Sequence, residues 1–270
     1  MAEFPQVPEH GAPPEIAAIF ADIRAVSGLP VVNLIWRHFA ALPGVLPWAW
    51  SAARPLIGSA ALDAGRQHIA SGVILPDIPP PGITAWHRAG ATDRGLERIG
   101  AMNGAYIRGN LTNVLALTAL RLRLERPDLP AAHLQPSRPA AEPLPPLDPL
   151  PRIGDLEPGL AARIRALALR HEGGGDGVIP SLYLALAPWP GVIEALPDWL
   201  GPLYEPATLR SVRASTCELV EAGAEALLPA LGPAPAEAAA TQRGLQRFTR
   251  VVIPDLIAVC FALRLVLPAP

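Results

Sequence analysis

The fold class is decided by a long stretch without proline, residues 93–124, which reads DRGLERIGAMNGAYIRGNLTNVLALTALRLRL. A run of this length without proline predicts one long helix, although its glycines weaken it. A second stretch, residues 242–267, reads QRGLQRFTRVVIPDLIAVCFALRLVL and carries Pro254 one place after the position equivalent to Asn110. Because glycine and proline both disfavour helix interiors, we expect the first stretch to be weakened at Gly109-Asn110 and the second at the same level.

These two stretches belong to a repeat of about half the chain. The block Ala119-Leu120-Arg121-Leu122 recurs as Ala262-Leu263-Arg264-Leu265, 143 positions later. The block Leu42-Pro43-Gly44-Val45-Leu46 corresponds to Trp189-Pro190-Gly191-Val192-Ile193, 147 positions later. Blocks that recur in the same order at nearly constant offsets predict two copies of one structural unit.

Other segments also favour helices. Residues 14–26 have apolar side chains at helical spacing, namely Ile16, Ile19, Phe20 and Ile23. Residues 33–42 form a further predicted helix, which Pro43-Gly44 closes. Alternating runs of β-branched residues, which are typical of strands, are scarce. The sequence therefore predicts an all-α protein.

A proline-rich segment separates the two copies. Residues 127–151 contain nine prolines, a composition that favours extended, polyproline II-like chain. We therefore expect a first helical repeat over residues 1–126 and a second over residues 152–270, joined by this linker into one compact unit. Two similar halves in one chain predict a pseudo-dimer about an approximate twofold axis, with a ligand cleft at the interface.

Composition excludes several classes of function. All 22 basic residues are arginine, and the absence of lysine excludes Schiff-base enzymes, pyridoxal phosphate enzymes and phosphate-loop proteins. A net charge of −2 without a long basic run lacks the electrostatic signature of a nucleic-acid partner. Cys217 and Cys260 are too few for a disulfide framework or a cysteine zinc site and are expected to be buried free thiols.

The chain is expected to be cytoplasmic and without a membrane partner. Its most apolar segment, residues 251–267, is shorter than a membrane span and contains Asp255 and Arg264, so a buried core helix is the simpler interpretation. The first residues lack the basic start and apolar core of a signal peptide.

The sequence contains no nucleophile elbow, zinc-binding helix, phosphate loop or dinucleotide fingerprint, and we expect neither a metal nor a cofactor. The histidines lack the spacing of metal ligands and are expected at the surface or as caps: His38, His68, His87 and His171. In Trp36-Arg37-His38-Phe39 the arginine could orient an anion, although a helix face with the guanidinium reaching solvent is the simpler expectation.

Several short motifs resemble those of the group I 2-haloacid dehalogenases, which are cofactor-free, all-helical hydrolases of both haloacid enantiomers. They span most of the chain in order: Leu29-Pro30, Phe39-Ala40-Ala41-Leu42-Pro43-Gly44, Gly109-Asn110 followed by Leu115-Ala116-Leu117-Thr118-Ala119-Leu120, Ser181 with Ala185-Leu186-Ala187-Pro188-Trp189-Pro190, and Arg247-Phe248. The resemblance implies two helical repeats joined by a long linker, in agreement with the repeat found above.

The resemblance also implies a site, from which this chain departs. In that family an aspartate follows a serine, seven residues before the tryptophan of the Trp-Pro motif, and activates the water that displaces halide from C2 of the haloacid. This chain has Ser181-Leu182 there, and leucine cannot accept a proton. Loss of a positioned general base lowers a rate by about 10²- to 10⁴-fold.

The pocket positions implied by the resemblance are also changed. The family's aromatic positions fall at Val31 and Leu34, while the pocket asparagine is retained as Asn110. Polar groups around the otherwise apolar cleft would then be few: Asn110, Asn113, Ser181 and Tyr183. Such a pocket suits a small, mostly apolar ligand held by a few hydrogen bonds, or it has been filled by core side chains.

Asp255 is a possible substitute base, because it follows the Pro254 interruption inside the most apolar segment. The simpler interpretation is that its carboxylate caps backbone N–H groups freed there.

Two functional hypotheses follow. One is a dehalogenase-like enzyme that hydrolyses the carbon–halide bond of a short 2-halocarboxylic acid, or that has a related cofactor-free hydrolytic activity. The other is a non-catalytic protein of the same fold that binds a small carboxylic acid or apolar ligand or has only a structural role. A homodimer is compatible with either hypothesis. Leu182 favours an altered or inactive site.

Overall fold

The computed structural model covers residues 1–270 and describes residues 5–128, 144, 147–172, 177–232 and 239–268. Within these residues every regular element is a helix and none is a strand, which confirms the predicted all-α class. The first half contains α1 (Pro14–Ser27), α2 (Leu34–Ala40), α3 (Val45–Ala53), α4 (Ala60–Gly72), α5 (Ile83–Arg88) and α6 (Asp93–Glu125). The second contains α7 (Pro158–Ala168), α8 (Ser181–Ala185), α9 (Pro190–Trp199), α10 (Gly201–Tyr204), α11 (Pro206–Glu225), α12 (Ala239–Arg247) and α13 (Ile253–Val266), with short 3-10 turns at Ile153–Asp155 and Leu228–Ala230.

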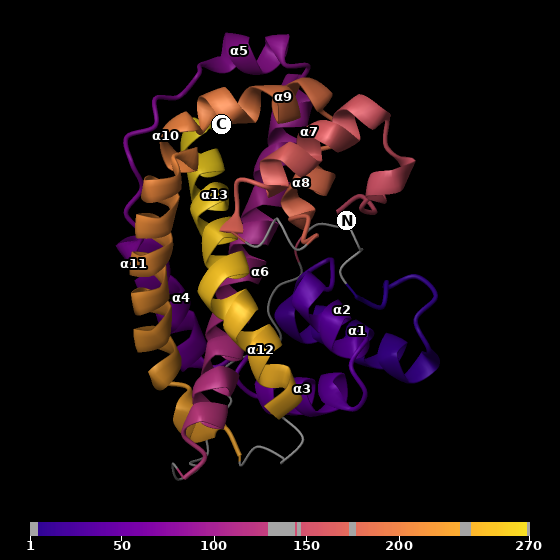
Figure 1. The fold of residues 1–270 in the computed structure, drawn as a ribbon, viewed down its shortest axis with the longest axis vertical. Helices are drawn as coiled ribbons and strands as arrows, with labels where there is room; N and C mark the ends of the chain where they lie inside the picture. Colours follow the sequence, from indigo (N-terminus) through magenta and orange to yellow (C-terminus); the bar gives the residue numbers. More distant parts are fainter. Residues whose placement is uncertain (1–4, 129–143, 145–146, 173–176, 233–238, 269–270) are drawn as a thin grey trace.

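The long helices of the two halves pack against each other in corresponding pairs. Helix α6 runs beside α13 through the middle of the molecule, and α4 lies against α11 on one side (Figure 1). Contacts between equivalent elements are what an approximate twofold relation produces. This arrangement, together with the shared order of helices, favours the proposed internal repeat. The limits of the two repeats, residues 1–126 and 152–270, stay a prediction.

Helix α6 continues through the level at which we expected it to weaken. It is 33 residues long, which corresponds to about 50 Å, and Thr92 caps its first turn by accepting a hydrogen bond from the backbone N–H of Gly95. A Cβ added at Gly109 would lie 3.3 Å from the Leu29 side chain, so glycine allows a close approach there. Tertiary packing over almost the whole length of the helix outweighs the small helix propensity of its glycines.

The corresponding helix of the second half is interrupted, as predicted. Between α12 and α13 the backbone forms a π-helical turn, η5 (Phe248–Val252), immediately before Pro254. Proline has no N–H to donate to the preceding turn, and an inserted π turn accommodates the lost hydrogen bond without ending the helix.

Buried side chains form two apolar clusters that both halves share. The first surrounds α1 to α4 and the C-terminal half of α6. It includes Trp36, whose indole N–H donates to Asn113 Oδ1 over 2.7 Å. The second surrounds α5, α7 to α10 and α13. Within the described residues, none of the helices combines the length and apolar character needed to cross a bilayer.

Candidate functional site

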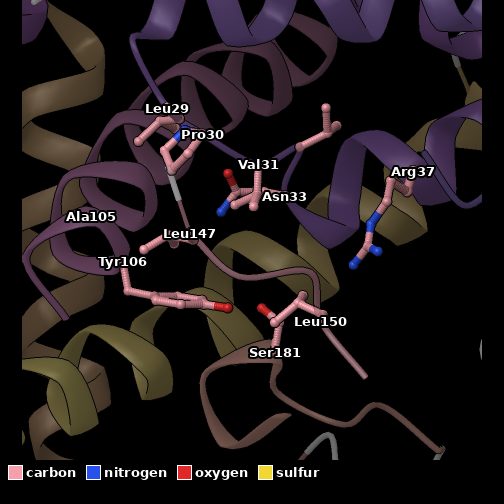
Figure 2. A pocket seen from close by; sticks show the side chains of 11 residues that line it. Leu29, Pro30, Val31, Asn33, Arg37, Ala105, Tyr106, Leu147, Leu150 and Ser181 are labelled. Carbon is pink, nitrogen blue, oxygen red and sulfur yellow. The ribbon is translucent and has the colours of Figure 1, made fainter. Parts of the chain in front are cut away.

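A small cavity, here called the inner cavity, lies where the two halves and the end of the linker meet. Its lining residues come from the α1–α2 connection, α2, α6, the linker end and α8: Leu29, Pro30, Val31, Val32, Asn33, Arg37, Ala105, Tyr106, Leu147, Leu150 and Ser181 (Figure 2). The chain turns into it because α1 ends at Gly28, which adopts φ +64° and closes the helix in the left-handed conformation. Its volume of about 10 Å³ is room for one water-sized group.

Arg37 is the charged group of this cavity. The residue is only partly accessible to solvent, and its guanidinium makes no hydrogen bond or ion pair with any residue in the described part of the chain. Burial lowers the pKa of Arg37 from its ordinary value, while the nearby Glu9 carboxylate opposes that change. The nearby Glu9 carboxylate is already engaged, because it accepts from the backbone N–H of Val32 over 2.8 Å and from Arg24. A guanidinium remains protonated in such a setting, so the cavity carries a positive charge with no carboxylate among its lining residues.

Two hydroxyl groups face each other beside this charge. Figure 2 shows the Tyr106 hydroxyl directed toward Ser181, the first residue of α8. The Tyr106 oxygen is buried, and Ser181 is the hydrogen-bonding side chain that acts on it. Burial raises the pKa of Tyr106 well above its ordinary value, whereas Ser181 and Arg37 act in the opposite direction. The phenol therefore stays protonated and can donate a hydrogen bond to a guest.

A larger cavity, the outer groove, adjoins the inner cavity and shares Val31, Leu147 and Leu150 with it. Its volume is about 180 Å³, and the other residues that line it are Arg98, Ala101, Met102, Asp148, Pro149, Pro151, Leu184, Ala185, Pro188 and Trp189. Asp148 is the one carboxylate among the residues that line either cavity, and it is exposed and paired with Arg98.

Two of the residues expected in the cleft from the sequence line the inner cavity, namely Val31 and Ser181. Leu34 is half-buried and packs against the first apolar cluster. Leu182 is 0 % exposed and belongs to the second apolar cluster, so at this turn of α8 the serine faces the inner cavity and the leucine faces the core.

The remaining expected polar residues are buried in contacts with the protein itself. The Asn110 amide donates to Cys260 Sγ at 3.7 Å, and the Asn113 amide donates to the carbonyl of Gly109 over 2.8 Å. The Tyr183 hydroxyl shares hydrogen bonds with His171 Nε2 at 2.7 Å and Tyr204 at 3.0 Å. None of these three side chains lines either cavity.

Asp255 lies in a separate buried cluster. Its Oδ2 atom is 3.6 Å from His171 Nδ1 and 3.5 Å from Arg213 Nη1, and neither of its oxygens accepts a hydrogen bond within the described residues. Tyr183 and Tyr204 belong to the same buried cluster, because the Tyr183 hydroxyl contacts His171 and Tyr204. Burial is the main cause that raises the pKa of Tyr183 far above its ordinary value and the pKa of Tyr204 to about 12. Asp255 lines neither cavity, so its role as a substitute base remains a hypothesis.

The structure corrects the expected positions of two histidines. His38 and His171 are both buried, because His38 bonds through Nδ1 to the carbonyl of Pro5 and His171 bonds to Tyr183. In the described part of the chain, no group of three or more His, Cys, Asp and Glu side chains could hold a metal ion. Both cysteines are free; Cys260 is buried as expected, whereas Cys217 is partly accessible.

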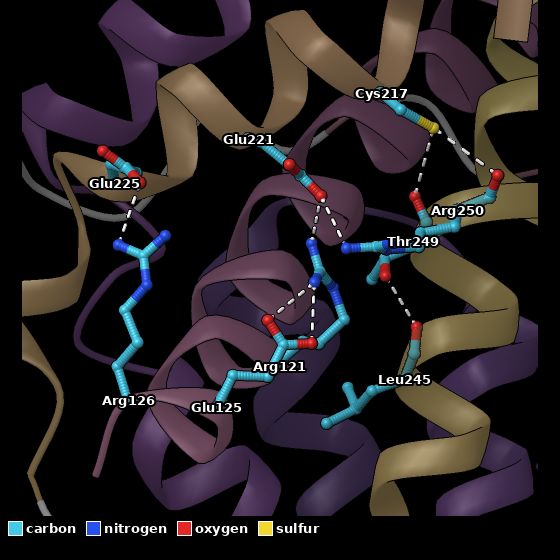
Figure 3. A network of polar contacts seen from close by, with 9 residues as sticks. All are labelled: Arg121, Glu125, Arg126, Cys217, Glu221, Glu225, Leu245, Thr249 and Arg250. Carbon is cyan, nitrogen blue, oxygen red and sulfur yellow. Dashed lines mark hydrogen bonds and ion pairs between the residues drawn. The ribbon is translucent and has the colours of Figure 1, made fainter. Parts of the chain in front are cut away.

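A further polar network lies away from both cavities, at the C-terminal end of α6 (Figure 3). Arg121 is 0 % exposed and pairs with Glu125 at 2.9 Å and with Glu221 of α11 at 2.6 Å. Glu221 also pairs with Arg250, so the network joins α6, α11 and the π-helical turn. Every charge in it has a partner, which indicates a structural role.

Sequence reasoning did not assign Tyr106, Leu147 and Leu150 to the site, and it treated Arg37 as a solvent-facing side chain. The signal in the sequence was weak, because Arg37 follows a tryptophan on an ordinary helix face. Leu147 and Leu150 lie in a linker without helical periodicity, whose path no local pattern predicts.

This all-helical arrangement was compared with proteins of known sequence and structure. No family model matches the chain. Over 63 residues it is 37% identical to an (R)-2-haloacid dehalogenase of Pseudomonas putida, and this match covers 23% of the chain and 21% of that relative. The matched segment thus spans about a fifth of the relative's length.

Solved structures extend the likeness to nearly the whole chain. A D-2-haloacid dehalogenase mutant in complex with D-2-CPA superposes with a TM-score of 0.75 at 20% identity, over 97% of this chain and 94% of that one. A D-2-haloacid dehalogenase in complex with L-LA gives a TM-score of 0.72 at 19% identity, over 98% and 94%. The chain therefore has the fold of the D-2-haloacid dehalogenases, which confirms at the level of the fold the resemblance found in its motifs.

Proposed function

We propose that this protein binds a small carboxylic acid with a carboxylate oxygen in the inner cavity and its other atoms toward the outer groove, and that it lacks the water-activating carboxylate needed to hydrolyse a 2-haloacid. The observation that carries the proposal is the Arg37 guanidinium, which lines the cavity with no carboxylate partner in the described part of the chain. The solved proteins with this fold are D-2-haloacid dehalogenases in complex with D-2-CPA and with L-LA, and an acid is the kind of ligand that such a charge selects.

The residues of the cavity suit a carboxylate in a particular way. Arg37 supplies charge-assisted hydrogen bonds, which are roughly twice as strong as neutral ones. Tyr106 and Ser181 have hydroxyl groups that can donate to the carboxylate oxygen in this cavity. Asn33 adds an amide at the same cavity. A cavity lined by several donors and by no carboxylate favours an anion over a neutral ligand.

The same cavity offers no general base. A water that attacks C2 must lose a proton, and neither a guanidinium nor a protonated phenol accepts one. Leu182 is packed in the core, and the one carboxylate of the adjoining groove, Asp148, is exposed and paired with Arg98. The proposed function is therefore binding without haloacid hydrolysis. Active hydrolysis through a base outside the cavity lining, such as Asp255, is the competing candidate.

The direct test is a calorimetric titration with acetate and with 2-chloropropionate, on the unmodified protein and on Arg37→Gln. Loss of a hydrogen bond to a charged group removes about 1.5–3 kcal/mol, so we expect Arg37→Gln to weaken binding about 10- to 100-fold. Arg88→Gln, at an exposed position on α5, is the matched control and should bind normally. Equal affinity in the Arg37→Gln variant, or no binding by the unmodified protein, would overturn the proposal.

A further inference from the structure

The outer groove extends the proposed carboxylate site in one direction. It shares three lining residues with the inner cavity, Val31, Leu147 and Leu150, so the two spaces meet at these side chains. A ligand whose charged group lies beside Arg37 would therefore direct the rest of its atoms past the linker end into the groove.

The sizes of the two spaces divide a ligand into a head and a tail. The inner cavity, at about 10 Å³, has room for one water-sized group, such as a carboxylate oxygen. The outer groove, at about 180 Å³, is larger than a cavity of about 150 Å³ that is known to admit benzene. A two- or three-carbon acid would leave most of this groove without ligand atoms.

The chemistry of the groove selects an apolar tail. Met102 and Trp189 are both nearly buried there, and Leu184 adds a third large apolar side chain. Methionine adapts to irregular shapes and makes favourable contacts with rings, and the part of Trp189 that Arg98 leaves accessible adds aromatic surface.

The charges at the groove's edge are already matched. The Arg98 guanidinium lies 5.3 Å from the centre of the Trp189 ring, and it forms an ion pair with Asp148 at the linker end. Because this pair neutralises itself, the groove presents no free charge to a tail. A polar tail would lose its hydration there without gaining a partner.

We propose that the ligands of this protein are carboxylic acids with an aromatic ring, or a branched group of similar size, one to three carbons from the carboxylate. The inference rests on the proposed carboxylate site and adds the class of tail. The carboxylate lies at Arg37, Tyr106 and Ser181, and the ring lies between Met102 and Trp189.

The test compares acetate with 3-phenylpropanoate by calorimetry, with the neutral 3-phenylpropanamide as a third ligand. Burial of a phenyl ring strengthens binding substantially, and we expect 3-phenylpropanoate to bind at least about 30-fold more tightly than acetate. Quenching or a shift of tryptophan fluorescence should accompany the aryl acid, because Trp189 lines the groove. Arg37→Gln should weaken both acids about equally.

A groove-filling variant separates the tail from the head. Ala101 lines the groove from α6, so Ala101→Phe should bring the affinity for 3-phenylpropanoate close to that for acetate. Ala70→Phe, at an exposed position on α4, is the control and should keep the difference between the two acids.

The outcomes distinguish this inference from the proposed function. If acetate binds in an Arg37-dependent way and the aryl acid binds no more tightly, the tail assignment is wrong and the carboxylate site stands. If neither acid binds, both proposals fail. If the amide binds as tightly as the aryl acid, the groove is an apolar site by itself, and the assignment of the head group to Arg37 is overturned.

Discussion

Replacing Leu182 with aspartate would test whether this position can hold the base that the resemblance places there. The side chain is 0 % exposed and packs in the second apolar cluster, away from the lining of both cavities. We expect Leu182→Asp to destabilise the protein severely and to produce no haloacid hydrolysis, because the introduced carboxyl would lie in the core.

The magnitude follows from burial. Truncation of a buried leucine removes about 2–5 kcal/mol of stability through lost transfer energy and the cavity left behind. A fully buried carboxyl has its pKa raised by about 3–5 units, and each unit corresponds to about 1.4 kcal/mol. Ionisation at high pH therefore adds about 4–7 kcal/mol of destabilisation, against a total stability of about 5–15 kcal/mol for a typical protein.

The control is Leu182→Asn, because the asparagine side chain resembles that of aspartate in shape and polarity but does not ionise. Since the introduced carboxyl keeps its proton in the folded chain after the unfolded chain has released it, stability falls as pH rises above about 4. Urea unfolding followed by circular dichroism between pH 5 and 8 should show Leu182→Asp losing up to about 1.4 kcal/mol per pH unit relative to Leu182→Asn. Equal stability of the two variants at every pH would show that the side chain reaches water and would refute this reasoning.

Three further perturbations test the packing and the charges of the fold. Gly191→Ala should lower the free energy of unfolding by about 1–3 kcal/mol in urea titrations, because the added Cβ would lie 2.5 Å from the backbone oxygen of Ala89. Gly100→Ala, on an open face of α6, is the control and should raise the free energy of unfolding by about 0.5–1 kcal/mol. If Gly191→Ala leaves the stability unchanged, the contact is contradicted. Burial lowers the pKa of His38, so the unfolded chain binds a proton at this residue before the folded chain does, and stability should fall as pH drops below about 6.5. His38→Gln should flatten this decline in thermal melts. An unchanged slope in the variant would show that His38 does not cause the decline. Arg121→Met should lower the free energy of unfolding by about 1–3 kcal/mol, which is less than for a wholly buried ion pair because the carboxylate partners of Arg121 reach solvent. A variant as stable as the unmodified protein would show that this network does not stabilise the fold.

Much of the helical framework was predictable from local pattern. The first helix was expected over residues 14–26 and runs over Pro14–Ser27, and the long α6 was expected over residues 93–124 and runs over Asp93–Glu125. Both have strong periodicity or a long run without proline, which are signals that neighbours in sequence alone provide.

The differences arise where distant segments decide the outcome. The sequence located the interruption near Pro254 but not its form as a π turn, which depends on how η5 packs against α6 and α11. It predicted a weakened helix at Gly109, where contact with Leu29 instead supports a continuous one. In both cases tertiary packing overrides intrinsic propensity.

The site was less accessible to sequence reasoning than the fold. Val31 and Ser181 were singled out and line the inner cavity, whereas Arg37 was treated as a solvent-facing arginine. The side chains that enclose Arg37 come from α6, the linker and α8, and no periodicity within α2 indicates which of them it meets. Orientation toward a cavity is a property of the assembled halves.

The measurement that tests the central claim most directly is halide release from racemic 2-chloropropionate by the unmodified protein, across pH 5 to 9. The inner cavity contains a cation and hydroxyl groups but no carboxylate to activate water, so we predict release no faster than in buffer alone, even at ligand concentrations that saturate the site in calorimetry. Steady release over many turnovers, abolished in Arg37→Gln, would contradict the account and show that a base outside the described lining serves this cavity.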